Sequence, residues 1–182
     1  MKTDITPLRG VLVLQPDVFH DSRGYFFETF SEKKYKELLG DFSFVQDNIS
    51  KSKKGTVRGF HYQAGANAQG KLCQVLSGKV LDVAVDIRFG SPTFGKHFDI
   101  ELSEENHLQL WIPPGFAHGF SVLSDEAVFM YKCTAPYSKA DERAILFNDS
   151  TLGINWKVQE PLVSEKDLLA KRFSEIEEDF IF

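Results

Sequence analysis

Apolar and polar residues alternate over short stretches along most of the chain, and turn residues separate these stretches. In DVAVDIR, residues 82–88, the alternation has a period of two, as expected for a strand with one buried face. Gly78, which follows Ser77, is expected to form a hairpin turn before this strand. Many short strands with frequent turns, and little room for parallel βαβ units, predict an all-β fold of the sandwich or barrel type.

Two segments have helical spacing instead. In SEKKYKELLG, residues 31–40, Ser31 is a candidate N-cap, one tyrosine and two leucines share a face, and Gly40 is a candidate end. In the tail SEKDLLAKRFSEIEEDF, residues 164–180, apolar residues again recur at helical intervals. The sequence therefore predicts a few short helices, including a C-terminal helical segment.

Length and composition narrow the class of protein. The 182 residues are 42% apolar, which suffices for one core, and we expect a single domain over residues 1–182. The net charge of −5 provides no basic face for a nucleic acid polymer and no polybasic run for a membrane surface. Neither a signal peptide nor an apolar run of ~20 residues is present, so we expect a cytoplasmic protein. Cys73 and Cys133 lack metal-ligand spacing and are expected to be free thiols.

Four polar side chains lie in or beside the apolar runs: His61 in TVRGFHYQ, Lys71 in KLCQV, His118 in PPGFAHGF and Tyr131 in AVFMYKC. Each has an ordinary explanation by itself, such as a structural histidine, a solvated strand end or a packed aromatic residue. Strand alternation nevertheless places Lys71 and Tyr131 on the same face as the apolar residue two positions further on. A lysine on an apolar inner face is costly unless it has a partner or a task.

Six sequence blocks occur together in a characteristic order. TVRGFHYQ is followed by QGKLCQVLSGKVLDVAVDIRFGSPTFGK, WIPPGFAHGF, YKCTAPY, NDSTLGINW and LVSEKD. From FHDSRGYFFETF to Asp167, the chain thereby resembles the dTDP-4-dehydrorhamnose 3,5-epimerase family of cupin-fold sugar-nucleotide enzymes. The resemblance implies a cupin-like jelly roll that uses no cofactor and no metal. It also implies epimerisation of dTDP-4-dehydro-6-deoxy-D-glucose at C3 and C5, which gives dTDP-4-dehydro-L-rhamnose.

The resemblance implies a catalytic role for four residues. His61 corresponds to the base, Asp167 to its carboxylate partner, Lys71 to the cation at the C4 oxygen, and Tyr131 to the acid on the opposite face. These residue types suit the chemistry, since the 4-keto group acidifies the C3 and C5 hydrogens and histidine has a pKa of about 6.5. Asp167 has a second interpretation, because Ser164 to Asp167 also reads as a helix capping box.

Binding a nucleotide diphosphate requires local cations in a protein of net negative charge. The family resemblance also implies a homodimer, in which the N-terminal segment with DSRGYFFETF completes the neighbour's site. Tyr137 is a candidate stacking surface for the base. The expected binding residues are Arg23, Glu28, Gln46, Asp47, Asn48, Arg58, Lys71, His118, Tyr137, Glu142 and Lys166.

Three alternatives remain open at the level of sequence. A metal-dependent cupin would need a cluster of histidines, but only His118 is a candidate ligand and FHYQ lacks a second histidine. A sugar-binding module without chemistry would not require His61, Lys71, Tyr131 and Asp167 together. A single-centre epimerase, acting at C3 or at C5 of a related nucleotide 4-keto-6-deoxysugar, needs the same base, cation and acid, so the sequence does not separate it from the double epimerase.

Overall fold

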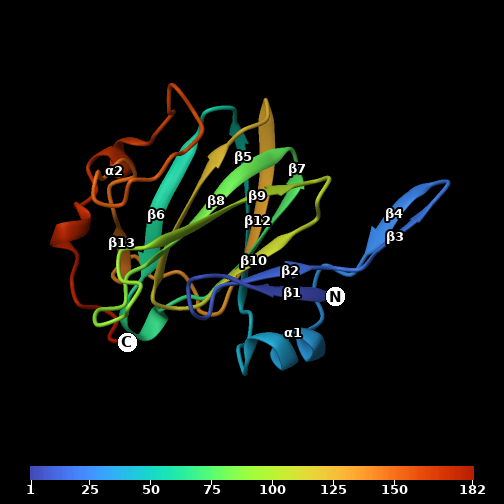
Figure 1. Ribbon diagram of the computed structural model, residues 1–182, viewed down its shortest axis with the longest axis horizontal. Coiled ribbons are helices and arrows are strands. Elements are labelled where there is room, and N and C mark those ends of the chain that lie inside the picture. Colours follow the sequence, from blue (N-terminus) through green and yellow to red (C-terminus); the bar gives the residue numbers. More distant parts are fainter.

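The computed structural model describes residues 1–182, and its strands form two sheets that face each other (Figure 1). All pairs within the sheets are antiparallel. The first sheet has the order β1 (Lys2–Ile5), β2 (Leu12–Gln15), β10 (Gln109–Ile112), β7 (Lys71–Ser77), β12 (Glu126–Cys133) and β5 (Gln46–Lys53). The second has the order β13 (Glu142–Ala144), β6 (Val57–Gln63), β11 (Phe116–Val122), β8 (Lys79–Asp86) and β9 (His97–Ser103).

The two sheets remain separate, so the predicted all-β jelly roll is confirmed in its sandwich form. A further hairpin, β3 (Val18–Asp21) with β4 (Gly24–Phe27), pairs with neither sheet. In Figure 1 this hairpin projects away from the sandwich. Its exposed phenylalanines, Phe19 and Phe26, are 65% and 70% accessible.

Apolar side chains from both sheets fill the space between them. Cys73 and Phe129 from the first sheet pack there with Ala84, Phe116 and Phe120 from the second. Burying such side chains contributes roughly 25 cal/mol per Å² of apolar surface, so this layer is a major source of stability. The site described below opens into one end of the same layer.

The second sheet is also covered on its outer face, which corrects one prediction. The C-terminal part of the chain packs Ile145, Phe147 and Trp156 against Val83 and Val85 there. Strand β8 is therefore buried on both faces, although its alternation predicts one exposed face.

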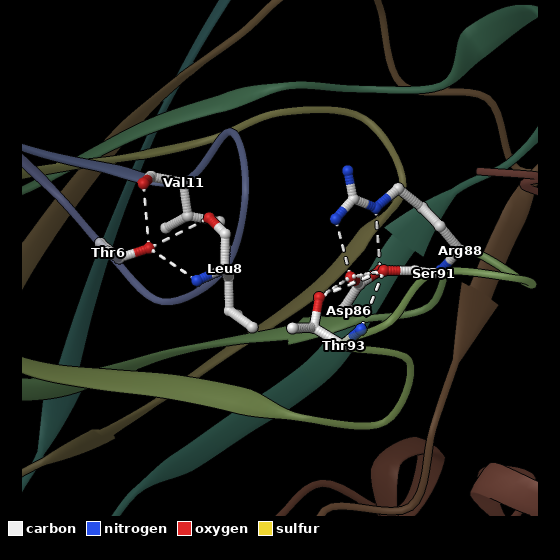
Figure 2. Close-up of polar contacts among 7 residues, drawn as sticks. All are labelled: Thr6, Leu8, Val11, Asp86, Arg88, Ser91 and Thr93. Atoms are coloured by element: carbon white, nitrogen blue, oxygen red, sulfur yellow. Dashed lines mark hydrogen bonds and ion pairs between the residues drawn. The ribbon is translucent and has the colours of Figure 1, made fainter.

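The aspartates of β8 occupy the inner face and are fully buried. The side chain of Asp86 accepts hydrogen bonds from Arg88, Ser91 and Thr93, as Figure 2 shows. Asp82 contacts His118. A buried carboxylate needs such hydrogen-bond partners. The local alternation of apolar and polar residues does not reveal the partners of either aspartate.

Gly78 does not form the predicted hairpin turn. It links β7 of the first sheet to β8 of the second, so the two strands that flank it are not paired with each other. Its φ of 79° suits glycine, and an added Cβ would collide with the Glu126 carbonyl oxygen.

The helices are short. Helix α1 (Glu32–Leu39) begins after Ser31, whose side chain makes no capping bond, and ends at Gly40 with φ of 93°. Tyr35 anchors α1, because it is 1% accessible and its hydroxyl donates to Gln109 Oε1 at 2.6 Å. The remaining helices are α2 (Glu165–Leu168) and the 3₁₀ turns η1 (Gly65–Asn67) and η2 (Phe173–Glu175).

The predicted C-terminal helical segment is thus reduced to one turn and a 3₁₀ turn. Leu169 is 84% accessible, so the apolar spacing there does not build a packed helix. Between the two turns, Lys171 pairs its backbone with Ile145 in a β-bridge, which diverts the chain from helical hydrogen bonding. None of the helices has the length and apolar character needed to cross a membrane.

Candidate active site

A cavity of about 520 Å³ opens between the two sheets, and most of the predicted site residues line it. Strands β5, β7 and β12 of the first sheet face β6 and β11 of the second across it. The predicted residues on its wall are Gln46, Asn48, Arg58, His61, Lys71, His118, Tyr131, Tyr137 and Glu142. Gln63 also lines the cavity and was not predicted, although it follows His61 by two positions on the same strand face.

His61 on β6 is held by a carboxylate. Its Nε2 lies 2.6 Å from Asp167 Oδ1, and the second oxygen of Asp167 accepts from the Gly59 amide at 3.4 Å. The Asp167 side chain is 4% accessible. Burial opposes its ionisation, but the hydrogen bond and charge of His61, with the amide of Gly59, lower the pKa of Asp167 overall. A carboxylate in this position fixes the orientation of the imidazole ring.

The two interpretations of Asp167 use different atoms of the residue. Ser164 Oγ accepts from the backbone amide of Asp167 at 3.2 Å, which caps α2. The carboxylate of Asp167 does not bond back to the Ser164 amide but turns to His61. Capping and pairing with the histidine therefore coexist.

Lys71 lies between the histidine and the tyrosine. Its Nζ donates to the backbone carbonyl of His61 at 3.3 Å and lies 5.7 Å from the ring centroid of Tyr131. Lys71 is 8% accessible, and burial lowers its pKa. Burial also raises the pKa of Tyr131 to about 12, so the phenol keeps its proton at neutral pH. The inward orientation predicted for both residues is confirmed.

His118 forms a second histidine–carboxylate pair on the floor of the cavity. Its Nε2 lies 2.6 Å from Asp82 Oδ1 and 3.7 Å from Cys73 Sγ. Burial lowers the pKa of His118, and the charge of Asp82 offsets only part of this effect. The imidazole is therefore neutral at neutral pH. The sequence did not predict Asp82, because its strand was expected to have a solvent face.

Cys73, Asp82 and His118 carry three possible metal-ligand atoms within 4.8 Å of one another. Two ligands about 2.0 Å from a tetrahedral ion would be about 3.3 Å apart. The 2.6 Å between His118 Nε2 and Asp82 Oδ1 is a hydrogen-bond distance instead. The geometry is that of a hydrogen-bonded pair.

Polar side chains surround the mouth of the cavity in a connected series. The amide of Gln46 donates to Asn48 at 3.0 Å and its oxygen accepts from the Tyr137 amide at 2.9 Å. The Tyr137 hydroxyl donates to Glu142 at 3.2 Å, and Glu142 pairs with Lys166 at 2.5 Å. Tyr137 is 53% accessible, so a ligand can reach its side chain.

Four predicted binding residues do not line the cavity within one chain, and of these only Lys166 reaches its rim, through the pair with Glu142. Arg23, in the β3–β4 hairpin, pairs with Asp21 at 2.6 Å, and Glu28, just after it, pairs with Lys34 at 2.8 Å. Asp47 points to the other side of β5 and pairs with Lys132 at 2.8 Å. The hairpin projects away from the sandwich whose sheets enclose the cavity (Figure 1).

The two-sheet fold and the proton-transfer groups between its sheets place the chain among the cupin-like isomerases. A family model described as dTDP-4-dehydrorhamnose 3,5-epimerase matches residues 5–175. The chain belongs to this family.

Individual relatives agree along nearly the whole length. The dTDP-4-dehydrorhamnose 3,5-epimerase of Shigella flexneri is 54% identical over 92% of this chain and 93% of its own. The dTDP-6-deoxy-D-glucose-3,5-epimerase of Legionella pneumophila, solved with dTDP-4-keto-L-rhamnose, superimposes with a TM-score of 0.93. It is 48% identical and covers 97% of this chain and 94% of its own. A 3′-monoepimerase of Streptomyces bikiniensis shares the fold at 32% identity, with a TM-score of 0.87 and coverage of 93% and 88%.

Proposed function

We propose that the protein inverts C3 and C5 of dTDP-4-dehydro-6-deoxy-D-glucose to form dTDP-4-dehydro-L-rhamnose. One observation carries the proposal: His61 and Tyr131 come from opposite sheets and enter the same cavity, with Lys71 in contact with both. Inversion needs a base on one face of the sugar and an acid on the other, and this arrangement supplies both. Residues 1–182 act as one catalytic domain in this proposal.

His61 removes the proton. Asp167 accepts a hydrogen bond from Nε2, so the neutral ring carries its proton there and Nδ1 has a free lone pair. Nδ1 takes the hydrogen from C3 or C5, and the electron pair moves into the 4-keto group. The buried carboxylate then stabilises the imidazolium that forms, as the aspartate of a catalytic triad does.

Lys71 and Tyr131 complete the cycle. The enolate carries its charge on the C4 oxygen, where a cation is worth most in a water-poor cavity, and Lys71 is that cation. Because C3 and C5 flank the same carbonyl, one oxyanion site serves both centres. Tyr131 holds its proton until the carbanion needs it and delivers it to the face opposite His61.

Charged and aromatic residues at the cavity mouth suit the nucleotide. Arg58 lines the wall and its Nε donates to Ser52 Oγ at 3.0 Å, which leaves its other nitrogens for a phosphate group. Lys166 adds positive charge at the rim, and the exposed side chain of Tyr137 suits stacking on a base. These local groups offset the net charge of −5.

We further propose that the protein acts as a homodimer in the cytoplasm. The β3–β4 hairpin carries Arg23 and exposed phenylalanines outside the sandwich, which supports a role in a neighbouring subunit's site. Exposed aromatic residues of this size commonly mark an interaction surface. The buried free thiols of Cys73 and Cys133 fit a reducing compartment.

Proton NMR of the substrate with the protein in deuterated water, with a chelator present, tests the function. Deuterium entering both C3 and C5, with conversion to the L-sugar, is the expected result. Entry at one carbon only would indicate a single-centre epimerase, the activity that the name of the Streptomyces bikiniensis relative describes. No exchange at either carbon would contradict the proposal for this substrate.

A further inference from the structure

The ammonium group of Lys71 lies inside the protein without an ion pair. It donates to the backbone carbonyl of His61 and to no carboxylate, although the residue is only 8% accessible. A buried ammonium loses much of its hydration, and the neutral amine becomes favoured unless a negative charge lies nearby. A neutral amine would stabilise the C4 oxyanion far less than a cation does. The protein therefore needs a counter-charge for Lys71.

Asp82, on the sheet opposite Lys71, is a buried carboxylate that also lacks a full set of partners. It is fully buried on β8, and its Oδ2 has no hydrogen-bond partner. Its Oδ1 binds Nε2 of His118, which in turn lies 3.7 Å from the sulfur of Cys73, two positions along β7 from Lys71. Asp82, His118 and Cys73 thus connect β8 with β7 between the sheets. An unpartnered buried carboxylate oxygen is costly and calls for an electrostatic explanation.

The other titratable groups around Lys71 carry no negative charge at neutral pH. Burial raises the pKa of both Cys73 and Cys133, so they are thiols, and it keeps Tyr131 a phenol and His118 a neutral imidazole. His61 is paired with its own carboxylate, Asp167. The groups whose charge or dipole faces the ammonium are Cys73 on β7, Tyr131 and Cys133 on β12, His118 on β11, His61 on β6 and Asp82 on β8.

We propose that Asp82 is a positioning residue that supplies the counter-charge for the Lys71 ammonium, with His118 held between them as a neutral spacer. The inference rests on the proposed function, in which Lys71 stabilises charge on the C4 oxygen. Because Asp82 makes no direct ion pair with Lys71, the ammonium stays free to contact the substrate. A direct ion pair would instead occupy the hydrogen-bond donors that the oxyanion needs.

The substitution Asp82→Asn separates charge from shape. Asparagine has the same size and keeps an oxygen for His118, but it removes the negative charge. Without that charge, Lys71 loses its proton at lower pH. In a plot of kcat against pH, the decline on the alkaline side (the basic limb) therefore moves to lower pH by about one unit. The variant should regain much of its kcat when the pH is lowered below this limb. A basic limb that stays at the wild-type position would overturn the proposal.

Asp86→Asn is the matched control. Asp86 lies on the same strand and the same inner face, is equally buried, and is paired with Arg88 instead. Its substitution should lower stability and leave the basic limb where it is in the wild type. An equal shift in both variants would mean that loss of any buried carboxylate moves the limb, and would also overturn the proposal.

Thermal unfolding gives a readout that needs no substrate. In the wild type, Asp82→Asn leaves the Lys71 charge uncompensated and lowers the Tm. In a Lys71→Met background the same change removes an uncompensated carboxylate and raises the Tm. If Asp82→Asn alone does not fold, the comparison between Lys71→Met and the double variant still decides. A further loss of Tm in the double variant would contradict charge compensation, whether or not the protein proves to be the proposed epimerase.

Discussion

His61 Nε2 and Asp167 Oδ1 lie 2.6 Å apart, although 106 positions separate the two residues in the chain. The strand that carries His61 belongs to the second sheet, whereas Asp167 enters from the short helix α2 in the C-terminal part of the chain. The contact therefore depends on how the C-terminal segment packs against the sheet. It also assigns the histidine's nitrogens, with Nε2 turned to the carboxylate and Nδ1 left for the substrate.

Asp167→Asn should lower kcat by roughly four orders of magnitude while KM changes little. The asparagine amide no longer stabilises the imidazolium, and it favours the tautomer with the wrong nitrogen protonated. Deuterium wash-in at C3 and C5, followed by NMR, measures the loss. Ser164→Ala is the control, because it removes the cap of α2 but leaves the carboxylate in place. The control variant should lose about 1 kcal/mol of stability, and its rate of deuterium exchange should change little. Equal losses of activity in the two variants would assign Asp167 a capping role only.

Tyr131→Phe should separate proton removal from proton return. The base is intact, so deuterium still enters the substrate, but inverted product forms roughly 10²- to 10⁴-fold more slowly. NMR distinguishes the two outcomes because exchange with retention and inversion give different sugars. Tyr137→Phe, at the cavity mouth, also removes a phenol hydroxyl, one that donates to Glu142, and should affect KM instead. Normal rates of inversion in Tyr131→Phe would remove the tyrosine from the mechanism.

Local rules were sufficient for part of this site. The alternation of side chains along β7 and β12 correctly placed Lys71 and Tyr131 toward the interior. Each of these two predictions needed only a few neighbouring residues, because side chains along a strand point alternately to its two faces.

Other parts depended on contacts that no local pattern contains. Asp82 was assigned to a solvent face, because nothing in residues 82–88 indicates that the C-terminal segment covers the outside of the same sheet. The pairing of Asp167 with His61 came from family resemblance and not from spacing. Arg23 and Glu28 pair with Asp21 and Lys34 outside the cavity, so their role in binding stays a prediction from the family resemblance.

Acid stability should depend on Asp86. Burial opposes its ionisation, but its bonds to Arg88, Thr93 and Ser91 lower its pKa overall. A carboxyl whose pKa is lower in the folded state stabilises the protein above the unfolded value of about 3.9, and this contribution is lost as the pH falls through the folded value. Asp86→Asn should therefore lower the Tm at neutral pH, by an amount equivalent to roughly 3 kcal/mol.

The pH dependence distinguishes this effect from a simple packing defect. Below about pH 4 the difference in Tm between Asp86→Asn and wild type should shrink, since the carboxyl is then protonated in the unfolded wild type first and in the folded protein at still lower pH. Asp21→Asn is the control, because Asp21 pairs with Arg23 on the exposed hairpin and such pairs contribute little. A difference in Tm that stays constant through the acid range would show that the charge of Asp86 does not stabilise the segment with Ser91 and Thr93.

Mixing two inactive variants should test whether the β3–β4 hairpin serves the neighbouring subunit. One variant carries His61→Ala, which removes the base, and the other carries Arg23→Ala, which alters only the hairpin. If the hairpin of one subunit completes the other's site, a mixed dimer has one site with both defects and one site with neither. Co-expression of the two variants should then restore a fraction of the wild-type activity, whereas each variant alone stays impaired. If Arg23 acts within its own chain, every site in the mixture keeps one defect and activity does not recover. A tagged heterodimer, purified before the assay, ensures that absence of recovery reflects the site and not a failure of the two chains to assemble.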